Sequence, residues 1–204
     1  MHTRRLTTIE LGINDEQVAV SDHIAYFWET DEQFKDAIGF LEIGLRGKDS
    51  CVLFGHRDAN DKVLSVLESR GFDLKQLEHQ GRIRMLGGKT SGQDMLSEIA
   101  EWFKQAVAAG APLIRLLGNI GWGHPDWPGE SDTLEFEARV TAACKTFPCI
   151  VLCMYDVSQL SGRIIHGAYE THPLTICGNV LRENPHCVPI DTFLTGLRAS
   201  KATA

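Results

Sequence analysis

The residues best suited to chemistry lie in the run Leu152-Cys153-Met154-Tyr155-Asp156, which places a thiol, a phenol and a carboxylate close together. On a strand, Cys153 and Tyr155 share one face, while Met154 and Asp156 share the other. A thiolate serves as a nucleophile or a metal ligand, and a phenol or carboxylate can orient a polar ligand. The alternative is structural, with a buried cysteine, a packing tyrosine and an aspartate that caps a turn.

Histidines supply the second candidate group. His172 precedes Pro173, which favours an extended backbone, so its ring either fixes a turn through a backbone hydrogen bond or contacts a ligand. The chain holds eight histidines and six cysteines, yet no pair has the recognised spacing of zinc ligands. Two alternatives stay open. One is a metal site assembled from distant segments, such as His23, Cys153 and His172, and the other is a cysteine–histidine enzyme.

The segment Gly88-Lys89-Thr90 matches only the end of a phosphate-binding loop. The full pattern needs an earlier glycine, separated from the Gly-Lys pair by four residues, and this chain has Ile83 there. We therefore interpret the segment as a surface turn. The glycine- and proline-rich stretch 118–129, which contains Trp122, is interpreted as a lid or a packed loop.

Predicted strands and helices, which position these residues, alternate along the chain. Apolar runs predict strands over 22–28, 51–54, 82–86, 112–117 and 150–154, and helical periodicity fills most of the stretches between them. Leu174–Cys177 and Val180–Leu181, joined by Gly178-Asn179, predict a hairpin. The fold class is therefore α/β, with three layers, a mostly parallel sheet, helices on both faces and a C-terminal hairpin. Ligands in such sheets bind beyond the carboxyl ends of the strands, which places the run 153–156 beside the site.

Helix boundaries are predicted from capping residues and glycines. Thr30 is expected to cap the first helix with Gln33 at its third position, and the helix is expected to stop at Gly47. Asp58 or Asn60 is expected to cap the second helix. The stretch 72–80 is interpreted as a connector, and the end of the chain as a short helix from 192 that frays after 198.

Composition limits the possible functions. The 204 residues include 43% hydrophobic and 23% charged residues, which is typical of a folded globular protein. The formal net charge is −7 and no basic cluster occurs, so we expect no direct nucleic-acid partner. No apolar run reaches transmembrane length and the first ten residues lack a signal-peptide apolar region, so we expect a cytoplasmic protein without a membrane partner. In that reducing compartment the six cysteines are expected to be thiols.

Several short motifs follow one another in an order that resembles one family. They are Asp22-His23-Ile24, Phe40–Gly47, Arg115 with Trp122, Phe136-Glu137, Leu152–Asp156, Thr171-His172-Pro173 and Asn184-Pro185. The combination resembles the MEDS domain, the sensory domain of methanogen and methylotroph regulators of the dichloromethane-response type. On this resemblance we divide the chain into an N-terminal arm (1–20), a sensory domain (21–191) and a C-terminal tail (192–204).

The resemblance implies a fold similar to that of the RecA/KaiC-like ATPases. In that comparison the strand Ile24–Phe27 would lead into the phosphate loop, but Trp28-Glu29-Thr30-Asp31-Glu32 follows, without Gly-Lys-Thr/Ser. Asn119 stands where such ATPases place a metal-binding acid, and its amide supplies no negative charge to Mg²⁺. The fold is thus expected, and the ATPase chemistry is expected to be lost.

The resemblance also implies a function: a non-catalytic sensory module in signal transduction that binds a small ligand, such as a hydrocarbon derivative, without a cofactor. The expected ligand-binding residues, at the carboxyl edge of the sheet, are His23, Tyr26, Trp122, Glu137, Cys153, Tyr155, Asp156 and His172. The chain has no room for an attached helix-turn-helix or kinase, so we expect output through a protein partner or self-association. The alternatives are a cysteine/histidine- or metal-dependent enzyme and a degenerate nucleotide-binding scaffold.

Overall fold

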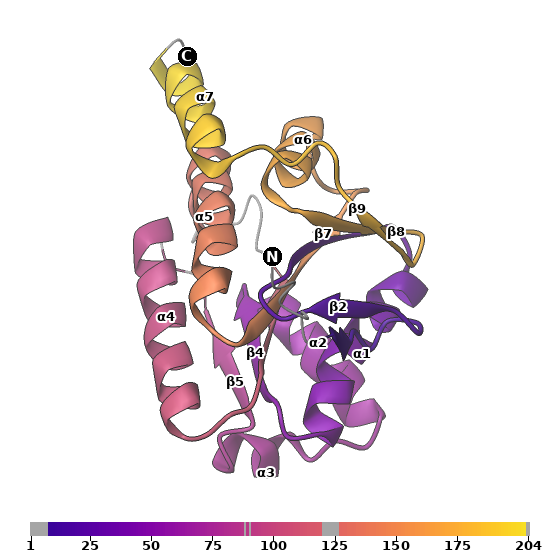
Figure 1. The fold of residues 1–204 in the computed structure, drawn as a ribbon. Helices are drawn as coiled ribbons and strands as arrows, with labels where there is room; N and C mark the ends of the chain where they lie inside the picture. The colour runs from indigo at the N-terminus through magenta and orange to yellow at the C-terminus, as the bar shows by residue number, and fades with distance from the viewer. Residues whose placement is uncertain (1–7, 88, 90, 120–126, 203–204) are drawn as a thin grey trace, which may run out of the picture.

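A seven-stranded sheet forms the centre of the molecule (Figure 1), and the computed structural model describes residues 8–87, 89, 91–119 and 127–202. The strands lie in the order β5-β4-β6-β7-β3-β8-β9. Their bounds are β3 His23–Trp28, β4 Ser50–Gly55, β5 Ile83–Leu86, β6 Ile114–Asn119, β7 Cys149–Asp156, β8 Leu174–Cys177 and β9 Val180–Glu183. Neighbouring strands run parallel except β8 and β9, which are antiparallel. The predicted α/β class with a mostly parallel sheet is confirmed.

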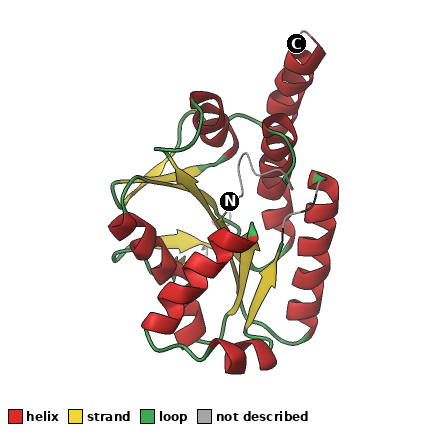
Figure 2. Ribbon diagram, turned by 180° about the vertical axis from the view of Figure 1, so that it is seen from behind, coloured by secondary structure: helices red, strands yellow, loops and turns green. Residues whose placement is uncertain are grey.

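Helices cover both faces of the sheet (Figure 2). Their bounds are α1 Asp31–Arg46, α2 Arg57–Ser69, α3 Leu74–His79, α4 Gly92–Ala108, α5 Glu130–Ala143, α6 Gly162–Thr171 and α7 Ile190–Ala202, with a 3-10 turn at Cys144–Thr146. Alternate residues of a strand face opposite layers. Ile24 and Leu152 pack in a core with α1 and α2, whereas Ala25 and Cys153 pack in a second core with α4, α5 and α6. The candidate residues on odd positions of β3 and β7 therefore face the α5–α6 layer.

The N-terminal segment packs onto the body as a small hairpin. Strands β1 Thr8–Glu10 and β2 Gln17–Ala19 pair antiparallel with each other and form a separate two-stranded sheet. Leu11, Ile13 and Val18 are at most 3% exposed and join the core that α1 and α2 share with the main sheet. This segment thus contributes to the core beside the sheet.

The predicted starts of the first helix and of the hairpin are confirmed. Thr30 caps α1. Its hydroxyl accepts a hydrogen bond from the Gln33 backbone, and the Gln33 side chain accepts one from the Thr30 backbone. Gly178 and Asn179 both have positive φ, 57° and 59°, which is the geometry of a two-residue hairpin turn. The turn sets the register in which β8 pairs with β9.

Several predicted boundaries are wrong. His56, rather than Asp58 or Asn60, caps α2, because its ring accepts a hydrogen bond from the Asp58 backbone. The expected connector over 72–80 contains the short helix α3, and α7 continues to Ala202 instead of ending near 198. The last strand before α6 runs through Asp156, because Tyr155 is fully buried and stays in the parallel ladder.

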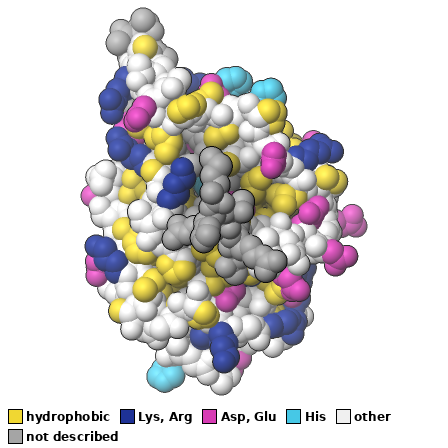
Figure 3. All heavy atoms as spheres, in the orientation of Figure 1, with side chains coloured by type: hydrophobic (Ala, Val, Ile, Leu, Met, Phe, Trp, Pro, Cys, Tyr) yellow, Lys and Arg dark blue, Asp and Glu magenta, His cyan; other side chains and the backbone are white. Residues whose placement is uncertain are grey.

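The outer surface mixes charges of both signs. On the face drawn in Figure 3, lysine and arginine side chains are dispersed among acidic ones and among apolar side chains. Helix α7 packs against α5 through Phe193, Leu194 and Leu197 and extends away from the sheet (Figure 1). Of the helices within the described ranges, none combines the length and the apolar character needed to cross a membrane.

Candidate functional site

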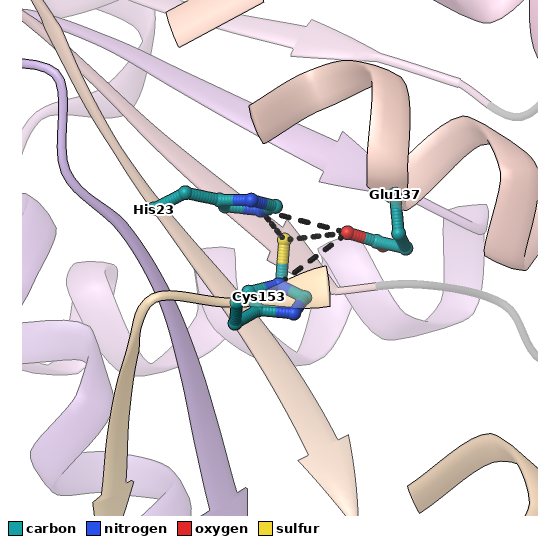
Figure 4. A group of neighbouring side chains, drawn as sticks. His23, Glu137 and Cys153 are labelled. Carbon is teal, nitrogen blue, oxygen red and sulfur yellow. Dashed lines mark hydrogen bonds and ion pairs between the residues drawn. The ribbon is translucent and has the colours of Figure 1, made fainter. Parts of the chain in front are cut away.

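Four ionisable side chains from four elements meet between the sheet and the α5–α6 layer. His23 is the first residue of β3, Cys153 lies in the middle of β7, Glu137 lies on α5, and His172 directly follows α6. Each is at most 3% exposed. The parallel register pairs His23 with Val151, so Cys153 lies two residues further along β7 on the same face. Figure 4 shows His23 and Glu137 pointing toward Cys153. We call these four residues the buried cluster.

The polar atoms of the buried cluster converge on one point. The Nε2 atom of His23 lies 3.3 Å from the Cys153 sulfur and 3.5 Å from Glu137 Oε2. The same carboxylate oxygen lies 3.4 Å from the Cys153 sulfur and 3.5 Å from His172 Nε2. One potential ligand atom from each residue lies within 4.8 Å of every other. This is the arrangement in which protein side chains hold a metal ion.

Hydrogen bonds behind the cluster fix both histidine rings. The Nδ1 atom of His172 lies 2.9 Å from the Ala168 carbonyl oxygen, which can only accept, so Nδ1 donates its proton. The Nδ1 atom of His23 lies 2.8 Å from the Thr141 hydroxyl, whose own proton goes to the Thr171 carbonyl. In each neutral ring the proton is therefore on Nδ1, and the lone pair of Nε2 faces the centre of the cluster.

Burial disfavours the charged form of each residue in the cluster. Loss of solvation lowers the pKa of His23 to about 3 and that of His172 to about 3. Burial likewise raises the pKa of Glu137, an effect that His172, Cys153 and Tyr155 partly oppose. Burial and the neighbouring Glu137 raise the pKa of the Cys153 thiol well above its ordinary value. The thiol is therefore protonated and a poor nucleophile near neutral pH.

Tyr155 links the cluster to a hollow at the sheet edge. Its ring meets His172 edge-on, with 5.7 Å between ring centroids. Burial and the neighbouring Glu137 raise the pKa of its hydroxyl well above the ordinary value. On its other side Tyr155 contacts Phe27, at 5.4 Å between ring centroids. Phe27 in turn stacks on Tyr169 of α6 at 4.8 Å. Aromatic rings thus form a continuous path from the cluster to the carboxyl ends of β3 and β8.

The hollow at these strand ends has a volume of about 360 Å³. We call it the edge hollow. Its lining residues are Phe27, Glu29, Gln33, Val157, Ile165, Tyr169, Cys177 and Gly178. The Tyr169 hydroxyl and the Cys177 thiol lie 3.4 Å apart, and this hydrogen bond and burial raise the pKa of Tyr169 to about 12. The floor is mostly apolar, and the polar groups lie at the rim.

The structure brings together five of the eight residues predicted for the site: His23, Glu137, Cys153, Tyr155 and His172. They meet beneath α5 and α6, inside the protein. His23 begins β3 and Cys153 lies in the middle of β7, whereas Tyr155, the second-last residue of β7, lies near the carboxyl edge at which the prediction places all of them. Two others lie elsewhere, and the last, Trp122, is outside the described residues.

Tyr26 and Asp156 project from the opposite face of the sheet. The Tyr26 hydroxyl lies 2.7 Å from the Gln33 carbonyl oxygen and 2.6 Å from Asn179 Oδ1. The Asp156 carboxylate accepts hydrogen bonds from the backbone and hydroxyl of Ser158, which fixes the turn after β7. Tyr26 therefore anchors the β8–β9 hairpin, and Asp156 has the capping role that was the structural alternative.

Sequence reasoning missed Thr141, which orients His23, and the edge-hollow residues Phe27 and Tyr169. One signal for Thr141 exists, because Glu137 and Thr141 are four residues apart and share one face of a helix. Both are buried there among apolar side chains. Polar residues repeated on the packing face of a helix mark a polar cluster in the core.

Comparison with known proteins identifies the family. The family model for MEDS, the methanogen/methylotroph DcmR sensory domain, matches residues 22–173. The transcriptional repressor DcmR of Methylorubrum extorquens is 28% identical over 158 residues, which cover 76% of this chain and 59% of the relative. The chain therefore spans about three fifths of that relative's length.

A solved structure is similar in fold. The KaiC-like protein of the hyperthermophilic archaeon Pyrococcus horikoshii OT3 has a TM-score of 0.60 at 13% sequence identity. The similarity covers 83% of this chain and 79% of the other. At this identity the comparison establishes the KaiC-like fold alone. Since the MEDS model matches well over half of the sequence, this chain belongs to the MEDS sensory-domain family.

Proposed function

We propose that this chain is a non-catalytic sensory module of a cytoplasmic regulatory system, and that it binds a small organic ligand in the edge hollow. Membership of a sensory-domain family and similarity to a transcriptional repressor support a regulatory role. The ligand class implied by the family resemblance is a small hydrocarbon derivative. Such a ligand needs an apolar pocket with a few polar groups rather than a phosphate-binding loop.

The composition of the edge hollow is the observation that carries this proposal. Its volume of about 360 Å³ falls in the usual range for small-molecule sites. Phe27, Ile165 and Tyr169 offer aromatic and aliphatic surface, and Glu29 and Gln33 supply polar groups at the rim. The hollow also lies at the carboxyl ends of parallel strands, where α/β folds bind ligands.

The residues after β3 argue against a nucleotide ligand. Glu29, Asp31 and Glu32 surround the start of α1, where a phosphate-binding loop would instead present glycines and a lysine. These carboxylates repel a triphosphate from the N-terminus of α1. Asn119, at the end of β6, is engaged with the Ala59 carbonyl oxygen at 2.8 Å. We therefore propose that ATPase activity is lost.

Helix α6 provides a route from the ligand to the rest of the molecule. Its residue Tyr169 lines the edge hollow, and His172 at its end enters the buried cluster. Gly167 of α6 lies against Leu134 of α5, and α7 packs against both helices. A ligand that binds one position of α6 better than another shifts the population toward that position. The shift of α6 would change the surface of α5 and α7, and a protein partner or a second copy of the chain would bind that surface differently.

A thiol enzyme is the second candidate, because Cys153, His23 and Glu137 lie within 3.5 Å of one another. They do not form a nucleophile–base–acid triad, since Cys153 and Glu137 both approach Nε2 of His23, and its Nδ1 contacts Thr141. All three are at most 3% exposed, and burial raises the pKa of the Cys153 thiol. Nucleophilic cysteines instead have a depressed pKa and are reachable by substrate. These features favour the sensory function.

The proposal is tested by amide NMR titration with n-butanol and dichloromethane as probes of the edge hollow. Saturable shifts are expected at Phe27, Tyr169 and Cys177. The variant Tyr169→Ala removes one wall and is expected to weaken binding about tenfold, equivalent to about 1.4 kcal/mol. Shifts that are absent, non-saturable or unchanged in this variant would contradict the proposal.

A matched control uses a second hollow of similar size. A hollow of about 350 Å³ lies between α2, α3 and β5, and Leu64 contributes to its lining. The variant Leu64→Ala is expected to leave probe binding in the edge hollow unchanged. If this variant abolishes the shifts, the probes bind at α2 and the edge hollow is not their site.

A further inference from the structure

We infer that the buried cluster of His23, Glu137, Cys153 and His172 binds one divalent transition-metal ion of the zinc class. This site is separate from the edge hollow and does not depend on the ligand proposed there. Four independent features of the cluster carry the inference: its dimensions, the orientation of its rings, its charge and its donor atoms.

The dimensions of the cluster fit a tetrahedral zinc site. Zinc–nitrogen and zinc–oxygen bonds of about 2.0–2.2 Å and a zinc–sulfur bond of about 2.3 Å give edges of about 3.3–3.6 Å between ligand atoms. The recorded edges are 3.3 Å from His23 to Cys153, 3.4 Å from Cys153 to Glu137, and 3.5 Å from Glu137 to each histidine. All four ligand atoms lie within 4.8 Å of one another. The two remaining edges, from His172 to His23 and to Cys153, are at most 4.8 Å, so a metal ion at the centre would draw His172 toward these two residues.

Both histidine rings are oriented as metal ligands are. Each donates its Nδ1 proton outward, His23 to the Thr141 hydroxyl and His172 to the Ala168 carbonyl oxygen. Metal-bound histidines almost always make such an outer hydrogen bond, which fixes the tautomer and leaves the other nitrogen for the metal. Within the described part of the chain, His172 Nε2 has no hydrogen-bond partner. A buried nitrogen lone pair that no hydrogen-bond donor contacts needs another partner, and a bound cation would supply it.

A divalent cation would balance the negative charges that deprotonation of the cluster creates. Once deprotonated, Cys153 and Glu137 carry two negative charges in a fully buried site. Among the residues described, the two cluster histidines are the ion-pair partners of Glu137, and both rings donate their Nδ1 protons away from it. A divalent ion cancels the two charges and stabilises the thiolate and carboxylate that the buried site otherwise disfavours.

The donor set selects the kind of metal. Two imidazole nitrogens, one thiolate sulfur and one carboxylate oxygen suit zinc and related ions, whereas magnesium and calcium prefer oxygen alone. Four protein ligands leave no open coordination position, which is typical of a structural zinc site rather than a catalytic one. Such an ion would join β3, β7, α5 and α6, and would fix the end of α6 that carries Tyr169.

The test uses the untagged full chain, reduced and stripped of metal with a chelator, and titrated with Co²⁺ as a spectroscopic probe for zinc. One equivalent is expected to give the intense visible absorption of four-coordinate cobalt together with a thiolate-to-cobalt charge-transfer band. Elemental analysis after incubation with Zn²⁺ and removal of free ion is expected to give one zinc per chain. Neither signal would appear if the cluster were only a hydrogen-bonded core network, and that result would overturn the inference.

Matched variants assign the ligands. Cys153→Ser is expected to abolish the charge-transfer band, whereas Cys149→Ser is expected to retain it, because Cys149 is a buried thiol of the same strand that contacts the Cys144 carbonyl instead. Thr141→Val leaves all four ligands in place and removes the outer hydrogen bond of His23, together with the bond from the Thr141 hydroxyl to the Thr171 carbonyl oxygen. It is expected to weaken cobalt binding roughly 10- to 100-fold.

A charge-transfer band that survives in Cys153→Ser would assign the ion to other residues and overturn the inference. Circular dichroism of each variant distinguishes a lost ligand from a lost fold, and Thr141→Val provides an answer even if a ligand variant does not fold. The result is also distinct from that of the probe titration, since metal binding and ligand binding in the edge hollow are measured separately.

Discussion

The six thiols of the chain differ in their access to solvent. Cys51, Cys144, Cys149 and Cys153 are buried, whereas Cys177 and Cys187 are only partly buried. Burial raises the pKa of Cys51 to about 12 and that of Cys153 well above its ordinary value. Because the thiolate is the reactive form, the raised pKa adds to burial in protecting Cys51 and Cys153, and burial also protects Cys144 and Cys149.

This difference predicts the pattern of labelling by Ellman's reagent near neutral pH. Cys177 and Cys187 are expected to react in the folded protein, although burial raises the pKa of the Cys187 thiol and slows its reaction. The other four are expected to react only as fast as the protein unfolds. The double variant Cys177→Ser/Cys187→Ser should therefore lose the fast phase. Rapid labelling of Cys153, located by mass spectrometry, would favour the thiol-enzyme function instead.

Close contact between two glycines joins the β1–β2 hairpin to α1. Gly12 has a φ of +85°, a conformation that side chains disfavour, and it is the second residue after β1. A Cβ atom added at Gly39 of α1 would lie 2.2 Å from the Gly12 carbonyl oxygen. The hairpin and the helix therefore approach each other backbone to backbone, which lets Leu11 and Ile13 enter the core.

The contact predicts opposite effects for two helical glycine substitutions. Gly39→Ala is expected to lower the free energy of unfolding by about 1–3 kcal/mol, because the hairpin must move away from α1. Gly196→Ala in α7, where no neighbouring atom of the described residues lies within 4 Å of the added Cβ, is expected to raise it by about 0.5–1 kcal/mol. Urea unfolding of both variants measures the difference. A stabilised Gly39→Ala protein would show that the hairpin is not held at this contact.

Local patterns account for what could be predicted about the elements. Apolar runs and caps locate the strands and the longer helices, because both signals depend on neighbours in sequence. The extent of β7 was missed, since Tyr155 and Asp156 look like a polar break although Tyr155 packs in the core. Helix α3 was missed because it has six residues and none of them is buried.

The site was predictable only as a set of residue types. His23, Cys153 and His172 could be named as candidates, but their meeting point depends on β3 lying beside β7 and on α5 and α6 covering that face. Strand order is a long-range property that periodicity does not encode. The expectation of a site at the carboxyl edge rests on the general behaviour of α/β folds. The edge hollow lies there, whereas the buried cluster lies inside the protein.

At the scale of the whole molecule, one buried cation joins three parts of the fold. Arg115 of β6 is 2% exposed and pairs with Asp49 at 2.7 Å, just before β4. Its guanidinium also donates to the Glu10 and Leu11 carbonyl oxygens of the N-terminal hairpin, at 2.9 Å and 3.2 Å. The ring of Phe40, on α1, lies 5.3 Å from the guanidinium carbon. Arg115 therefore connects the sheet, α1 and the hairpin.

Arg115→Met is expected to lower the free energy of unfolding by about 3–5 kcal/mol, because it leaves Asp49 and the two carbonyl oxygens without their donor. Arg57→Met provides the control, since Arg57 pairs with Asp61 on the exposed face of α2, and a change within about 0.5 kcal/mol is expected. Chemical denaturation followed by circular dichroism measures both. Equal stability of the two variants would contradict the connecting role of Arg115.

The position of β3 in the sheet has a consequence for biosynthesis. This strand leaves the ribosome early, yet its two neighbours, β7 and β8, are among the later segments to be made, and His23 meets a partner 130 positions along the chain. Until then His23–Trp28 is an apolar strand with both edges unpaired. Nascent or truncated chains that end before Cys149 expose a segment prone to intermolecular pairing and depend on chaperones to shield it.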